Sequence, residues 1–71
     1  MERTGVEYGA RIERGVILSA ETGGYIVKSE DRPGVETTPI ADIHGETHDV
    51  NEHVVFFMFD DGSGGILGQW S

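Results

Sequence analysis

All three histidines of the chain lie within ten residues, and carboxylates alternate with them. The segment contains His44, Glu46, His48, Asp49, Glu52 and His53. Imidazole and carboxylate groups bind zinc or nickel when three or four of them converge on one point. In an extended segment, His44, Glu46 and His48 would share one face, so they are the candidate metal ligands of the sequence.

The composition of this segment nevertheless favours a solvated loop over a metal site. Gly45, Asp49 and Asn51 are typical of a loop without fixed geometry, and the spacing matches no zinc signature. We therefore expect neither a metal nor another cofactor. Because histidine titrates at about pH 6.5, a loop with clustered histidines is still expected to respond to pH in that range.

A second candidate is the acidic, glycine-rich stretch from Asp60 to Gly65. An EF-hand loop needs a glutamate at its twelfth position, and the twelfth residue counted from Asp60 is Ser71. Phosphate-binding glycine loops precede a helix and use a nearby cation, whereas no Lys or Arg follows here. The pair Asp61-Gly62 instead predicts a hairpin turn.

The sequence contains no recognisable catalytic nucleophile. None of its serines lies in a Gly-x-Ser-x-Gly elbow. Paired carboxylates such as Asp60 and Asp61 catalyse proton transfer only within a cleft. A barrel of this size fills its interior with side chains, so we expect a protein that is not an enzyme.

The elements that would hold these residues are predicted to be strands. Apolar residues recur with a period of two between residues 6 and 20, which predicts one long strand with its even positions on the core face. Such a strand exceeds the usual length, so we expect a bend or bulge near Arg14-Gly15. The pattern breaks there and at Ile17.

Turn signals divide the rest of the chain into short strands. The predicted order is a hairpin turn at residues 21–24, a strand at 25–29, a type II turn at Arg32-Pro33-Gly34, a short strand or irregular segment at 40–44, a polar loop at 45–52, and a final hairpin with strands at 53–59 and 66–70. No window shows a helical period.

Five short strands with glycine-rich turns predict an all-β, single-domain protein spanning residues 1–71. The expected architecture is a small five-stranded barrel, and OB-like and SH3-like strand orders both stay open. The predicted core consists of Val6, Tyr8, Ala10, Ile12, Val16, Leu18, Tyr25, Val27, Ile40, Val54, Phe56, Met58 and Ile66.

The strand at residues 53–59 is apolar on both faces. One face carries Val54, Phe56 and Met58, and the opposite face carries Val55, Phe57 and Phe59. A domain of this size buries only about 60% of its unfolded surface. The chain has 71 residues and no cysteine, so disulfides cannot support it and oligomerisation is the expected support.

The second apolar face predicts a contact with another protein. The candidate interface residues are Val55, Phe57, Phe59, Leu67 and Trp70, with Arg32 as an additional anchor presented by a rigid turn. A pairing of Arg32 with Glu30 or Asp31 is the alternative for that residue. Internal cover of the second face by residues 1–5 or by the 30–39 loop is the alternative for the face.

The charge of the chain restricts its partners. It carries 13 acidic and 5 basic residues, a net charge of −8, and every basic residue lies in the first 32 positions. Such a charge repels nucleic acid and anionic membranes, so we expect a protein partner. No apolar run approaches the length of about 20 residues that a membrane helix requires, so we expect a cytoplasmic protein.

Three features of the sequence are similar to known small barrels. They are the strand pair at residues 10–19 and 25–29, the loop Asp31-Arg32-Pro33-Gly34-Val35, and the ending from Val50 to Leu67, in which a polar turn precedes an apolar strand, an Asp-Gly hairpin and a last strand. This pattern resembles small β-barrel components of phage tails and baseplates. Asn51-Glu52 stands where many of those proteins have Gly-Asp.

The resemblance implies a structural, oligomeric part of a virion and supplies no catalytic residues. The first hypothesis is therefore a structural or assembly protein, either a homo-oligomer or a subunit of a larger particle. The alternative is an acidic inhibitor or decoy. In that case, the seven carboxylates beyond Pro33 would occupy the nucleic-acid-binding groove of a basic partner.

Overall fold

The computed structural model describes residues 10–70, which form five strands: β1 (Arg11–Glu21), β2 (Gly24–Ser29), β3 (Ala41–Asp42), β4 (His53–Met58) and β5 (Gly64–Gln69). The predicted all-β class is confirmed. The predicted core residues Val6 and Tyr8 lie outside the described residues. Residues 10–70 contain no helix long and apolar enough to cross a membrane.

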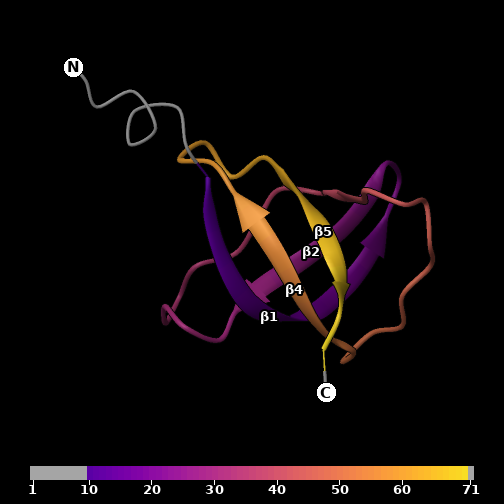
Figure 1. The fold of residues 1–71 in the computed structure, drawn as a ribbon, viewed down its shortest axis with the longest axis horizontal. Helices are drawn as coiled ribbons and strands as arrows, with labels where there is room; N and C mark the ends of the chain where they lie inside the picture. Colours follow the sequence, from indigo (N-terminus) through magenta and orange to yellow (C-terminus); the bar gives the residue numbers. More distant parts are fainter. Residues whose placement is uncertain (1–9, 71) are drawn as a thin grey trace.

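The strands form one strongly curled sheet in the order β2-β1-β4-β5-β3 (Figure 1). Most neighbours are antiparallel, but β3 and β5 are parallel. A backbone bridge between Tyr25 and Ile40 joins β2 to the residue before β3. The neighbours thus follow the circular order β1-β2-β3-β5-β4, which is the OB-like one of the two predicted strand orders.

Strand β1 is shared by both halves of the curled sheet. Residues 11–16 pair with β4, and residues 15–21 pair with β2. The register shifts between Ile17 and Ser19, so the bulge predicted at Arg14-Gly15 is wrong in position. Gly15 has a different role, because a methyl group placed on it would lie 2.6 Å from Val27 Cγ1 and 2.7 Å from Phe56 Cε1. Its missing side chain lets the two walls of the barrel approach each other.

The predicted inward face of β1 is also wrong. Glu13, Gly15 and Ile17 point inward, whereas Ile12 and Leu18 are exposed and Val16 is half-buried. The odd positions can face the core because Gly15 fits under its neighbours and Glu13 is paired with a cation. The observed core consists of Ile17, Val27, Ile40, Val54, Phe56, Met58 and Ile66, with Tyr25 and Val35 packed against it.

The predicted turns are confirmed. The β1–β2 turn lies between the paired residues Glu21 and Gly24. In the β4–β5 turn, the N–H of Phe59 donates to the carbonyl of Ser63 at 2.8 Å. Gly34 has a φ of 79°, as the third residue of a type II turn requires, and the N–H of Val35 donates to the Arg32 carbonyl.

The segment between β2 and β3 runs along β2. The N–H of Thr37 donates to the Val27 carbonyl, and the N–H of Val27 donates to Thr37 Oγ1 at 3.0 Å. Val35 packs against the core. The segment therefore covers part of the barrel interior. The strand predicted at 40–44 is reduced to the two residues of β3.

Candidate functional site

The two faces of β4 have different surroundings. Val54, Phe56 and Met58 are buried in the core, whereas Val55 and Phe57 are half-buried on the opposite face and Phe59 follows them at the start of the hairpin. The predicted division of this strand into two apolar faces is therefore confirmed. The outward face can contact a second molecule.

Side chains from two other segments, Ile12 and Ile43, extend the apolar surface around Phe57. Ile12 of β1 is the cross-strand partner of Phe57, and Gly65 of β5 is its partner on the other side. A methyl group placed on Gly65 would meet the Phe57 ring at 2.9 Å and Ile43 Cγ2 at 3.0 Å. The ring and the Ile43 side chain therefore lie over Gly65.

Ile12, Ile43, Phe57 and Phe59 together are called the outer patch below. The rings of Phe57 and Phe59 meet edge to face with centroids 5.9 Å apart. Ile12 is 70% exposed, Ile43 53% and Phe59 38%. The sequence predicted Phe57 and Phe59 at an interface but missed both isoleucines. The wrong inward face assigned to β1 hid Ile12, and no pattern indicated Ile43.

The other predicted interface residues lie farther along the same strands. Val55 is half-buried between Arg14 and Gly68 in the sheet register. Leu67 lies at the register shift between β4 and β5 and is half-buried. These residues extend the apolar surface only partly, because their neighbours cover them.

Trp70 packs against the Arg14 guanidinium, so its indole ring is not freely exposed. The Arg14 guanidinium lies 5.2 Å from the centroid of the indole ring, and His53 meets that ring edge to face. Arg14 also pairs with Asp31 at 3.1 Å, and His53 pairs with Glu30 at 2.9 Å. Within residues 10–70, the buried indole Nε1 atom has no hydrogen-bond partner. This end of the outward face is polar and internally paired.

Arg32 is also engaged within the molecule. Its Nε atom lies against the Glu13 carboxylate, which is 7% exposed. Glu13 projects inward from β1, and Arg32 follows β2, so the pair joins the β2–β3 segment to the barrel. Neither Glu30 nor Asp31 is its partner, and Arg32 is not carried forward as an interface residue.

The histidine-rich segment is organised around one buried ring. The side chain of His48 is 3% exposed; its Nε2 atom lies 2.6 Å from Asp42 Oδ2, and its Nδ1 atom lies 2.5 Å from Glu52 Oε2. Its backbone N–H donates to the Tyr25 hydroxyl at 3.0 Å, and the two rings meet edge to face. Asp42, His48 and Glu52 are called the histidine clamp below.

Each acidic member of the clamp also holds the backbone of the loop. Asp42 Oδ1 accepts the N–H groups of His44 at 2.6 Å and Glu46 at 3.4 Å. Glu52 Oε1 accepts the N–H of Asp49 at 2.9 Å. The loop that the sequence predicted to lack fixed geometry is therefore tied at both ends and in its middle.

The clamp changes the protonation behaviour of its three members. Burial works to lower the pKa of His48, but the hydrogen bonds to Glu52 and Asp42 outweigh it and raise that pKa. The hydrogen bond from His48 Nε2 lowers the pKa of Asp42, and the hydrogen bond from His48 Nδ1 lowers the pKa of Glu52. The imidazolium and both carboxylates thus stabilise one another's charged forms.

The predicted metal triple is not assembled in the structure. His48 is buried in the clamp, whereas His44 and Glu46 are exposed. No group of three or more potential ligands within residues 10–70 could hold a metal ion. Sequence reasoning missed Asp42 and Glu52 as partners of His48, because their spacing in an irregular loop matches no periodic pattern.

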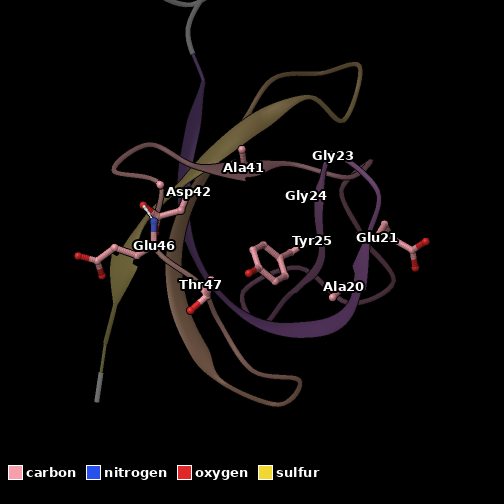
Figure 2. A pocket seen from close by; sticks show the side chains of 10 residues that line it. Ala20, Glu21, Gly23, Gly24, Tyr25, Ala41, Asp42, Glu46 and Thr47 are labelled. Atoms are coloured by element: carbon pink, nitrogen blue, oxygen red, sulfur yellow. Dashed lines mark hydrogen bonds between the residues drawn. The ribbon is translucent and has the colours of Figure 1, made fainter.

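A pocket of about 300 Å³ lies beside the clamp. Tyr25 lies between the β1–β2 hairpin, with Ala20 and Glu21, and the opposite wall, with Glu46 and Thr47 (Figure 2). The remaining lining residues are Gly23, Gly24, Ala41, Asp42 and Gly45. The pocket contains carboxylates but no cation, so it is unsuited to an anionic ligand.

Comparisons with known proteins found no relative of this chain. No family model, curated protein or solved structure matches the chain.

Proposed function

We propose that this protein is a non-enzymatic structural or assembly protein that docks onto a neighbouring subunit through the outer patch. The exposure of Ile12, Ile43 and Phe59 around Phe57 is the observation that supports the proposal. Soluble monomers rarely expose large contiguous apolar patches, and such patches mark interaction sites.

The size of the patch suits such a contact. Fully burying one exposed large apolar side chain contributes about 1.5–3 kcal/mol. Ile12 and Ile43 are more than half exposed, and Phe57 and Phe59 would contribute less because they are already partly buried. Repetition of this contact around a ring would multiply the gain. The affinity also depends on the ordering cost of association, so the area alone does not determine it.

The class of particle follows from the sequence resemblance. The arrangement of hairpins in this chain resembles that of small β-barrel components of phage tails and baseplates, so the proposed assembly is a phage or phage-like particle. The neighbouring subunit is another protein, and a second copy of this chain is the simplest candidate.

The alternative of an acidic decoy has less support. Asp42 and Glu52 are engaged in the clamp, and Asp61 accepts hydrogen bonds from Ser63. Two of the seven carboxylates after Pro33 are thus engaged in the clamp, and the five exposed ones are spread over three separate segments. The affinity of a decoy for its partner would fall steeply as ionic strength rises, whereas the affinity of docking through apolar side chains would not.

Light scattering coupled to size-exclusion chromatography tests the proposal. We expect the wild-type chain to self-associate with rising concentration, and F59S to remain closer to the monomer mass of 7.7 kDa. The matched control is L18S, because Leu18 is also 38% exposed but lies outside the patch. A wild-type chain that stays monomeric at high concentration, or equal effects of both substitutions, would contradict self-assembly through this surface.

A further inference from the structure

The loop between β3 and β4 forms one wall of the pocket and is fastened to the barrel at His48. Gly45, Glu46 and Thr47 belong to that wall. Among the described contacts of residues 44–50, those of His48 are the ones that reach β2 and join both ends of the loop. The position of the wall therefore depends on His48 together with the hydrogen bonds that Asp42 accepts from His44 and Glu46.

The contacts of the His48 ring require a proton. Both ring nitrogens face carboxylate oxygens, at 2.6 Å and 2.5 Å. A neutral imidazole has only one N–H, so its other nitrogen would direct a lone pair at an oxygen of the second carboxylate. An imidazolium donates to both, and the arrangement is then fully hydrogen-bonded.

The carboxylates cannot turn away without disturbing the loop. The second oxygen of Asp42 accepts backbone N–H groups from His44 and Glu46, and the second oxygen of Glu52 accepts the N–H of Asp49. Relief of a repulsive contact at His48 would thus break hydrogen bonds that shape the loop. Movement of the ring itself would break both of its carboxylate contacts and its edge-to-face contact with Tyr25.

The groups that face the ring are few and come from every neighbouring element. Asp42 approaches from β3, Glu52 from the residue before β4, and Tyr25 from β2. Within residues 10–70, no lysine or arginine pairs with either clamp carboxylate. The proton on His48 is therefore the positive charge that holds the two acids together.

We propose that the histidine clamp is a proton-operated latch, in which protonated His48 holds the 44–50 loop against the barrel and loss of that proton releases the loop and widens the pocket. The latch is closed at pH values below the raised pKa of His48 and opens as pH rises through it. It works independently of the outer patch, so its failure leaves the proposed assembly role untouched.

The expected pH dependence follows from proton linkage. The closed latch keeps its proton to a higher pH than a released histidine does, and opening releases one proton. Between the two titration points, the opening constant should therefore rise about tenfold per pH unit. Above the titration point of the closed latch, it should level off.

Nuclear magnetic resonance with hydrogen exchange tests the latch on the full chain. We expect both ring nitrogens of His48 to carry protons at pH 6, below the ordinary histidine value. After correction for intrinsic exchange, the amides of His48 and Asp49, which are hydrogen-bonded in the closed loop, should lose protection across the His48 titration. In H48Q these amides should be unprotected throughout, whereas H53Q should behave like the wild type because His53 is exposed and outside the clamp.

Three results would overturn the latch. One is a His48 ring that carries a single proton at pH 6, and another is loop protection that does not follow the His48 titration. The third is simultaneous loss of protection at core amides such as Phe56, because this would indicate global unfolding. If H48Q does not fold, D42N provides the same test. Because one carboxylate partner is removed, His48 should then titrate at lower pH, and the loop should open at a lower pH than in the wild type.

Discussion

Two groups of buried charges attach loops to this barrel, and they differ in how completely their polar atoms are hydrogen-bonded. Glu13 and Arg32 join β1 to the segment after β2, but within residues 10–70 Glu13 Oε1 and Arg32 Nη2 are buried without hydrogen-bond partners. In the histidine clamp, both ring nitrogens and all four carboxylate oxygens have partners.

The difference concerns how each group responds to its surroundings. The charge of Arg32 is permanent at any ordinary pH, so the Glu13–Arg32 pair fixes the loop at the cost of unsatisfied polar atoms. The clamp is fully hydrogen-bonded only while His48 is protonated. The Glu13–Arg32 pair therefore holds its loop in one arrangement, whereas the histidine clamp can release its loop when His48 loses a proton.

The largest expected effect comes from breaking the Glu13–Arg32 pair. R32A leaves the Glu13 carboxylate buried without a cation, which should lower the free energy of unfolding by about 3 kcal/mol, the low end for buried pairs because Arg32 is partly exposed. Urea denaturation followed through the fluorescence of the single tryptophan, Trp70, measures this loss. The double variant E13L/R32M removes both charges and should recover most of the stability; a double variant as unstable as R32A would contradict this explanation.

Replacing the clamp histidine should have a smaller effect that depends on pH. H48Q loses hydrogen bonds to two charged groups, so we expect a loss of about 2 kcal/mol at pH 6. The same denaturation experiment at pH 6 and pH 9 measures it, and the difference from wild type should shrink at pH 9. H53Q should stay within about 0.5 kcal/mol of wild type. A deficit in H48Q that is independent of pH would argue for packing alone.

The wild-type chain should itself show the contrast between the two groups. Because the folded-state pKa of His48 is raised, its stabilisation is fully present below about pH 6.5 and is lost as pH rises through that raised pKa. Because the pKa values of Asp42 and Glu52 are lowered, their stabilisation is present above their ordinary values and is lost as pH falls through the lowered ones. Thermal melting across pH should therefore show a maximum between these limits. In H48Q the alkaline decline should be absent.

The smallest effect should come from the tyrosine that accepts the His48 N–H. Y25F keeps the ring in place and removes one neutral hydrogen bond, so we expect a loss of about 1 kcal/mol. Hydrogen exchange at the His48 amide should rise more than exchange at core amides. Equal changes at both would show that the hydroxyl acts through global stability.

The sequence predicted the class, the hairpins and most of the core, because β4 and the glycine turns have strong local signals. It predicted the wrong inward face for β1. Glu13 violates the apolar pattern, and only its distant partner Arg32 makes its burial acceptable. Gly15 likewise contributes by having no side chain, so its role depends on Val27 and Phe56. Neither contact is visible in a local window.

The clamp was unpredictable for a related reason. Its residues lie in an irregular loop, where no period relates sequence spacing to a shared face. The histidines suggested pH sensitivity, but nothing in the sequence distinguished His48 from the exposed His44 and His53. Two of the four outer-patch residues were predicted, Phe57 of β4 and Phe59 directly after it. Ile12 and Ile43 were missed, and Ile43 reaches the patch because of the path that the backbone takes after β3.

The position of β5 in the sheet determines when the chain can fold during synthesis. This strand pairs with β4 on one side and β3 on the other, and its residue Ile66 is fully buried. The apolar residues of β4 emerge from the ribosome before β5 does, so the nascent chain briefly exposes a segment of high aggregation propensity. Asp60 and Asp61 follow that segment directly and supply the charges that oppose its association with other chains.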